Sequence, residues 1–153
     1  MPNIIEISTG EISVGRNGDV ISTLGIGSCV AVCLYDKTSR IGGMIHAMLP
    51  TRSGGTINED QEKGKFVDEA IMQLIAEMER AGARKERLTA KLVGGANMFE
   101  IFSDGIGQKN VKSAKKILSL LNVPVEGEST GGSNGRSTRF SIDNGIVEVI
   151  VRM

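Results

Sequence analysis

The first third of the chain consists of short apolar runs bounded by Gly, Asn and Asp, which is the pattern of β-strands joined by turns. The runs at residues 30–35 and 41–49 are separated by one short polar segment, which allows them to pair as a hairpin. Further strands are expected at residues 4–7, 12–14 and 20–24. The amino-terminal part of the chain is therefore predicted to consist mainly of β-strands.

Two later segments have apolar residues at spacings of three and four. Between residues 65 and 81 these residues share one helical face, and Gly82 follows as a stop signal. A second helix is expected over residues 111–121, with Asn110 as its cap. Residues 88–92 alternate apolar and polar between the two helices, so they are expected to form a strand.

The carboxyl-terminal segment is expected to form a hairpin. The Asn-Gly pair at 144–145 is preferred in two-residue type I′ turns, and with this pair as the loop Ile142 faces Val147. Strands around two helices predict an α+β fold, in which a β-sandwich core of mixed and antiparallel strands has both helices packed on one side. The length of 153 residues predicts one domain spanning residues 1–153.

The composition excludes several classes of protein. Lys+Arg and Asp+Glu both total 18, and a net charge of 0 argues against a general nucleic-acid binder. One His and two Cys cannot build a closed zinc site of four Cys or His ligands within one chain, and we expect neither metal nor cofactor. No apolar stretch approaches membrane-spanning length, which predicts a cytoplasmic protein without membrane insertion.

Cys29 is the strongest candidate for a catalytic residue. It follows a Gly-rich turn, which can expose the thiol and aim backbone N–H groups at a bound carbonyl. An adjacent imidazole would convert the thiol into a nucleophilic thiolate, and His46 is the single imidazole of the chain. The alternative is that Cys29 and His46 are ordinary interior residues, which is how we interpret Cys33 within its apolar run.

The register of the predicted hairpin decides whether Cys29 and His46 meet. One register sets the two residues directly opposite each other, and the register that pairs Asp36 with Ile41 makes them diagonal neighbours on one face. The intermediate register points them to opposite faces. The apolar pattern leaves all three registers open.

Two sequence blocks point to a known family. Residues 23–36, TLGIGSCVAVCLYD, and residues 42–50, GGMIHAMLP, resemble the CheD family of chemoreceptor glutamine deamidases. Shorter matches follow in the same order along nearly the whole chain, at residues 65–68, 91–99, 106–110 and 131–136. The resemblance implies a single glutamine deamidase domain with a fold similar to that of glutamine-deamidating bacterial toxins.

The resemblance also implies an activity, a site and partners. It implies a protein-glutamine glutaminase that hydrolyses glutamine side chains on the cytoplasmic helices of methyl-accepting chemoreceptors, through a Cys thioester, to glutamate and ammonia. At the matching positions, Cys29 is the nucleophile, His46 the base and Thr23 the residue that positions the imidazole. The CheC phosphatase is an implied partner, and the alternative function is a chemotaxis adaptor that mainly binds and regulates CheC.

Overall fold

The computed structural model describes residues 2–52, 63–97 and 105–153. In chain order, its elements are β1 (Asn3–Ile7), β2 (Ile12–Arg16), β3 (Asp19–Ile26), β4 (Val30–Asp36), β5 (Ile41–Ala47), α1 (Val67–Ala81), the short 3₁₀ helix η1 (Lys85–Arg87), β6 (Leu88–Gly94), α2 (Ile106–Leu120), β7 (Val125–Thr130), β8 (Arg136–Ser141) and β9 (Ile146–Val151). Most expected strands and the first expected helix lie within two residues of these bounds.

The strands form two sheets that pack face to face. One sheet has the order β1-β3-β8-β9 and the other has the order β2-β5-β4-β6-β7. Each sheet contains one parallel pair, β1 with β3 and β6 with β7, and is otherwise antiparallel. A buried apolar cluster fills the space between the sheets, and its members are Ile7, Ile21, Cys33, Met44, Phe140 and Ile142.

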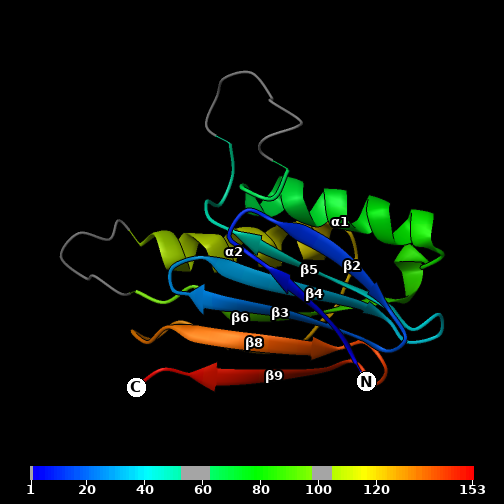
Figure 1. The fold of residues 1–153 in the computed structure, drawn as a ribbon. Helices are drawn as coiled ribbons and strands as arrows, with labels where there is room; N and C mark the ends of the chain where they lie inside the picture. Colours follow the sequence, from blue (N-terminus) through cyan, green and yellow to red (C-terminus); the bar gives the residue numbers. More distant parts are fainter. Residues whose placement is uncertain (1, 53–62, 98–104) are drawn as a thin grey trace.

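Both helices cover the outer face of the five-stranded sheet, on the side away from β8 and β9 (Figure 1). The inward face of α1 contributes Leu74 and Met78 to a second core, and α2 contributes Leu118. The prediction of an α+β sandwich with two helices on one side is therefore confirmed. The likeness to bacterial toxins stays a prediction.

Side chains of β5 alternate between the two cores, because successive residues of a strand point to opposite faces. Ile45 and Ala47 belong to the core beneath the helices, whereas Met44 belongs to the cluster between the sheets. His46 follows the same alternation and points toward β3 of the four-stranded sheet, where it meets Thr23. The pleat of β5 therefore places the single imidazole between the two sheets.

Helix α2 begins earlier than the apolar pattern predicts. Its N-cap is Gly105, and Asn110 lies inside the helix, so the prediction of Asn110 as the cap is wrong. The apolar pattern does not reach the start of α2 because the buried face there carries Gly107 and Asn110, which add no apolar signal. A Cβ atom at Gly107 would collide with the carbonyl oxygen of Ala96, so the glycine allows α2 to approach the end of β6.

The register of the last hairpin differs by two residues from the predicted one. Ser141 pairs with Ile146 and Phe140 pairs with Val147, which leaves a four-residue loop at 142–145. Ile142 does not face Val147; its side chain is buried between the sheets and its backbone N–H donates to Asp19. A shift of two residues keeps each side chain on its predicted face, because the pleat also repeats every two residues.

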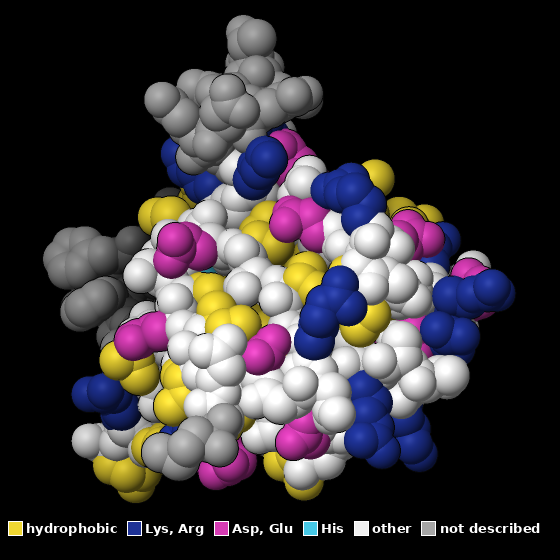
Figure 2. All heavy atoms as spheres, turned by 45° about the vertical axis from the view of Figure 1, so that its right-hand side comes forward, with side chains coloured by type: hydrophobic (Ala, Val, Ile, Leu, Met, Phe, Trp, Pro, Cys, Tyr) yellow, Lys and Arg dark blue, Asp and Glu magenta, His cyan; other side chains and the backbone are white. Residues whose placement is uncertain are grey.

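The remaining expectations concern loops, membranes and charge. The Gly-rich sequence of residues 52–56 predicts a surface loop, and residues 53–56 of it lie outside the described residues, as do residues 98–99 of one family-like block. Within the described ranges, no helix is long and apolar enough to cross a membrane. Figure 2 shows acidic and basic side chains interspersed over the face in view, in agreement with the net charge of 0.

Candidate active site

Thr23 and His46 meet between the two sheets. The Thr23 Oγ1 atom lies 2.7 Å from His46 Nδ1, and it also lies 2.7 Å from the carbonyl oxygen of Ile7. A carbonyl oxygen only accepts, so the one hydroxyl proton of Thr23 is donated to Ile7. The Thr23 oxygen must then accept from Nδ1–H, which fixes His46 in the tautomer that carries its proton on Nδ1.

The other ring nitrogen of His46 is left as a free base. His46 is fully buried, and its Nε2 atom has no hydrogen-bond partner within the described part of the chain. Burial lowers the pKa of His46 below the ordinary value of 6.5, so the imidazole is neutral at neutral pH. A neutral imidazole with its lone pair on Nε2 can take a proton from a nearby acid.

Cys29 lies one residue before β4 and is half-buried. The observed register pairs Asp36 with Ile41 and Val30 with Ala47. Of the three registers left open by the sequence, this is the one that makes Cys29 and His46 diagonal neighbours on one face. The pairing of β4 with β5 thus fixes His46 on the face that Cys29 shares when the alternation of β4 is continued by one residue beyond the ladder.

Burial also sets the state of the Cys29 thiol. Partial burial raises the pKa of Cys29 above its ordinary value, and the backbone N–H of the same residue opposes this rise. The thiol is therefore protonated in the resting protein. Nucleophilic attack by this sulfur requires a base to remove its proton.

The end of β6 holds the turn that carries Cys29. The carbonyl of Cys29 accepts from Gly95 N–H at 2.7 Å, and the carbonyl of Gly27 accepts from Ala96 N–H at 2.9 Å. Gly94 adopts φ 116°, and a Cβ atom there would collide with the carbonyl oxygen of Cys29. Only glycine permits this approach, so the glycine that ends β6 has a structural reason.

A cavity of about 540 Å³ lies beyond the end of β6. It is lined by Gly95 and Asn97 after β6, by the Gly131-Gly132 pair after β7 and by side chains of α2. Glycines on two sides leave backbone groups accessible along its wall. Among the described residues that line it, none is Thr23, Cys29 or His46, so it adjoins the end of β6 and not the reacting groups themselves.

Cys33 differs sharply from Cys29. It is 2% exposed between the sheets, and burial raises its pKa to about 12. Both cysteines are free thiols. Cys33 is therefore a core residue, as predicted from its apolar run. No group of three or more His, Cys, Asp or Glu side chains that could hold a metal ion occurs among the described residues.

Comparisons with known proteins identify relatives over most of the chain. A family model described as CheD chemotactic sensory transduction matches residues 48–151. The "Chemoreceptor glutamine deamidase CheD" of Thermotoga maritima is 43% identical over 139 residues, which cover 91% of this chain and 86% of that protein. The "Probable chemoreceptor glutamine deamidase CheD" of Methanococcus maripaludis is 41% identical over 148 residues, which cover 95% of this chain and 94% of that protein.

Solved structures show weaker likenesses. A Neisseria meningitidis protein of the DUF152 family is 12% identical, with a TM-score of 0.46 over 86% of this chain and 63% of that chain. A hypothetical protein of Bacillus licheniformis is also 12% identical, with a TM-score of 0.45 over 80% of this chain and 50% of that chain. Likenesses of this size say nothing about the chemistry of the site.

Proposed function

Because the chain belongs to the CheD family, we propose that it is a chemoreceptor glutamine deamidase that hydrolyses glutamine side chains to glutamate and ammonia. The observation that carries this proposal is the 2.7 Å contact between Thr23 Oγ1 and His46 Nδ1. This contact leaves Nε2 of His46 as the unpaired ring nitrogen, and the register places His46 diagonally across from Cys29 when β4 is continued by one residue. The arrangement supports a thiol nucleophile and an imidazole base.

The first half of the reaction forms a thioester. The Cys29 sulfur attacks the side-chain amide carbon of the glutamine while His46 Nε2 takes the thiol proton. The carbonyl π electrons move onto oxygen, and backbone N–H groups of the Gly-rich turn stabilise this oxyanion. When the carbonyl re-forms, the C–N bond breaks and the proton on Nε2 passes to the departing nitrogen, which leaves as ammonia.

The second half of the reaction releases the product. A water molecule attacks the thioester carbon while Nε2 takes one of its protons. The C–S bond then breaks, the sulfur recovers the proton from His46, and glutamate is formed. One amide and one water give one carboxylic acid and one ammonia, and the enzyme returns to its starting state without a metal or redox partner.

The resting charges of the site favour this sequence. Burial raises the pKa of the Cys29 thiol and lowers the pKa of the His46 imidazole, so both groups are neutral before substrate binds. A thiolate–imidazolium pair is then not held in a buried site at rest, where its desolvation would be costly. Thr23 orients the imidazole without a charge, so it stabilises the imidazolium less than a carboxylate would.

We propose that residues 1–153 act as one catalytic domain on the cytoplasmic helices of methyl-accepting chemoreceptors. The family resemblance further supports CheC as a partner of the same protein. The competing function is an adaptor that mainly binds and regulates CheC. Such an adaptor would not require a buried imidazole that is oriented by Thr23 and has an unpaired Nε2 atom, so the site geometry favours the enzyme.

Mass spectrometry of a receptor cytoplasmic fragment tests the proposed function. The fragment is incubated with the wild-type protein, with a His46→Ala variant or with buffer, and each glutamine is followed for conversion to glutamate. We expect conversion at particular glutamines by the wild type, with loss of most of the rate in His46→Ala. If the wild type converts no glutamine and binds purified CheC tightly, the adaptor function replaces the enzyme.

A further inference from the structure

Asn110 is a polar residue on the core-facing side of α2. The buried residues of this helix are Gly107, Asn110, Ala114 and Leu118, and Asn110 is 0% exposed. Burying an amide costs free energy unless its polar atoms are hydrogen-bonded, and Asn is a poorer helix former than Leu or Ala. Packing alone would therefore favour an apolar side chain at this position.

The side-chain amide of Asn110 joins the two segments that carry Cys29 and His46. Its Nδ2 atom donates to the carbonyl oxygen of Ser28 at 2.8 Å and to the carbonyl oxygen of Met48 at 3.0 Å. Ser28 directly precedes Cys29, and Met48 lies two residues after His46. One NH₂ group thus binds both segments with its two protons.

These two bonds lie just beyond the point where the sheet stops holding the segments. The β4–β5 ladder ends with the pair Val30–Ala47, so Ser28 and Met48 are both outside it. Beyond the ladder, the Cys29 turn bonds to the end of β6 and the N–H of Met48 donates to Lys65, so each segment is held by a different neighbour and no β4–β5 backbone pair joins them directly. The two hydrogen bonds donated by the Asn110 side chain supply this link from a third element, α2.

The carbonyl oxygen of the Asn110 side-chain amide accepts no hydrogen bond from the described residues. This Oδ1 atom is buried. An unpaired buried acceptor is unfavourable, and an apolar residue of similar size would avoid it. The two donated bonds must therefore contribute something that offsets this cost.

We propose that Asn110 is a positioning residue that sets the distance between the Cys29 sulfur and Nε2 of His46. This inference rests on the proposed function, because it assigns Asn110 to the proton transfer between these two groups. Asn110 does not touch the reacting atoms. It acts through the carbonyls of Ser28 and Met48, and a small displacement of either segment changes how readily the thiol proton passes to the imidazole.

Ser113 offers a matched control on the same helix. Its hydroxyl donates to the carbonyl of Pro50 at 2.6 Å, so it also ties α2 to the segment after β5. It makes no bond to the Cys29 turn. A Ser113→Ala variant therefore removes a comparable helix-to-backbone hydrogen bond while leaving both donors of Asn110 in place.

The experiment compares Asn110→Leu, Asn110→Asp and Ser113→Ala with the wild type, at a temperature at which circular dichroism shows each variant to be folded. The Leu side chain removes both donors at similar volume, and the Asp side chain keeps the shape but replaces the donating nitrogen with an oxygen. In both Asn110 variants we expect kcat for receptor glutamine conversion to fall at least about tenfold, with KM within about threefold. In Ser113→Ala we expect kcat within about twofold of the wild type.

A second measurement does not depend on the substrate. Alkylation of Cys29 by iodoacetamide is followed from about pH 6 to about pH 10 in each variant and in His46→Ala, with the modified residue mapped by mass spectrometry. We expect the profile of Asn110→Leu to move toward that of His46→Ala, and the profile of Ser113→Ala to match the wild type. A purely structural role for Asn110 would leave the profile of the folded variants unchanged.

The outcomes separate the two proposals. A folded Asn110→Leu or Asn110→Asp protein with wild-type kcat and a wild-type alkylation profile overturns the role of Asn110, while conversion by the wild type leaves the proposed function in place. If the wild type converts no glutamine, the proposed function fails. The alkylation profiles then still decide whether Asn110 controls the pairing of Cys29 with His46.

Discussion

One hydroxyl proton sets the chemical state of His46. Thr23 donates this proton to the carbonyl of Ile7, so its oxygen can only accept from Nδ1–H of the imidazole. The lone pair of the imidazole is thereby left on Nε2, which is buried and has no hydrogen-bond partner among the described residues. At the scale of single residues, the tautomer of one buried imidazole determines whether the thiol has a proton acceptor.

Replacing Thr23 by Val tests this dependence. Valine keeps the shape of the side chain but removes the acceptor of Nδ1–H, so we expect kcat to fall roughly 10- to 100-fold. Thr23→Ser keeps the hydroxyl and should remain within about threefold of the wild type. Nitrogen-15 NMR gives an independent check, because the chain contains one His and its spectrum reports this imidazole alone. An unchanged tautomer and kcat in Thr23→Val would contradict the role of Thr23.

His46 also predicts how stability depends on pH. Burial lowers its pKa in the folded state below the ordinary value of 6.5, so below that value the unfolded chain binds more protons than the folded chain. The contribution of His46 to stability is therefore complete above about pH 6.5 and is lost as the pH falls toward its folded pKa.

Urea unfolding at about pH 7.5 and about pH 5.5, with His46→Asn as the comparison, measures this contribution. The wild type should lose more unfolding free energy than His46→Asn over this interval, since only the wild type carries the titrating imidazole. Equal losses in both proteins would show that His46 is not desolvated as the structure places it.

Sequence patterns predicted part of the site and missed part of it for physical reasons. Cys29 and His46 stood out because the chain has few thiols and one imidazole, but their pairing depended on a hairpin register that the apolar pattern leaves open. Thr23 came only from the family resemblance, because its contact with His46 crosses between two sheets. The sequence predicts Asn110 as a helix cap, whereas it lies inside α2, because a buried glycine and a buried amide near the start of the helix add no apolar signal.

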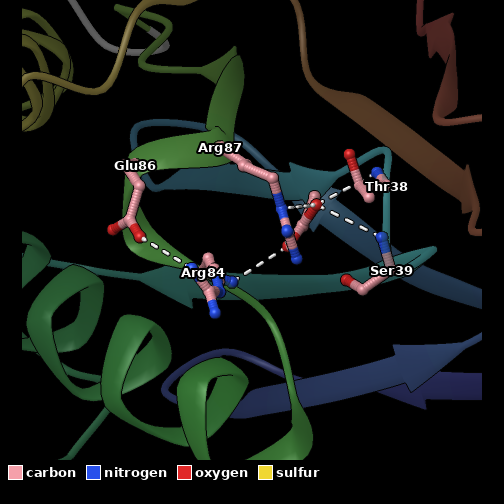
Figure 3. Close-up of polar contacts among 6 residues, drawn as sticks. Thr38, Ser39, Arg84, Glu86 and Arg87 are labelled. Carbon is pink, nitrogen blue, oxygen red and sulfur yellow. Dashed lines mark hydrogen bonds and ion pairs between the residues drawn. The ribbon is translucent and has the colours of Figure 1, made fainter.

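At the scale of elements, a buried carboxylate fixes the end of the β4–β5 hairpin opposite to Cys29. Asp36 is 0% exposed and accepts from the backbone N–H groups of Thr38 at 3.0 Å and Arg84 at 2.9 Å. Arg87 forms an ion pair with it at 2.8 Å (Figure 3). This network ties the turn of the hairpin to the start of β6, and it anchors the register that pairs Asp36 with Ile41.

Replacing Asp36 by Asn should destabilise the protein. Burial alone raises the pKa of Asp36, but the hydrogen bonds from Arg87, Arg84 and Ser39 outweigh it and hold the pKa well below the usual range. The amide leaves Arg87 without its counter-charge, and we expect the thermal unfolding midpoint to fall by roughly 5–10 °C. Because the folded pKa is lowered, the stability from this carboxylate is present above about pH 4 and is lost as the pH falls.

Glu86 provides the control in the same network. It pairs with Arg84 at 4.0 Å, and the two side chains are 72% and 68% exposed (Figure 3). Exposed ion pairs contribute little to stability, so Glu86→Gln should change the midpoint by no more than about 1 °C. Calorimetry of both variants that gave equal midpoints would contradict the importance assigned to Asp36.

The elements themselves were more predictable than their pairing. Alternation and helical spacing located α1 and most strands because each buries one continuous apolar face. The start of α2 and the β8–β9 register were missed because Gly107 and Ile142 serve contacts distant in sequence. Local periodicity reports which face of an element is buried, whereas pairing depends on partners elsewhere in the chain.

The whole molecule places its two cysteines in contrasting surroundings. Both lie at the same strand, four residues apart, and both are free thiols. Cys29 is half-buried at the end where β3, β5, β6 and α2 converge, whereas Cys33 is packed between the sheets. The three-layer arrangement thus leaves the Cys29 thiol partly exposed and buries the Cys33 thiol.

This contrast gives the most direct test of the central claim, that Cys29 is the nucleophile. Conversion of receptor glutamines to glutamates is measured by mass spectrometry with Cys29→Ala and Cys33→Ala, each shown to be folded. The account predicts that Cys29→Ala loses at least about 10³-fold in rate while Cys33→Ala stays within about threefold of the wild type. Conversion by Cys29→Ala at the wild-type rate would contradict it.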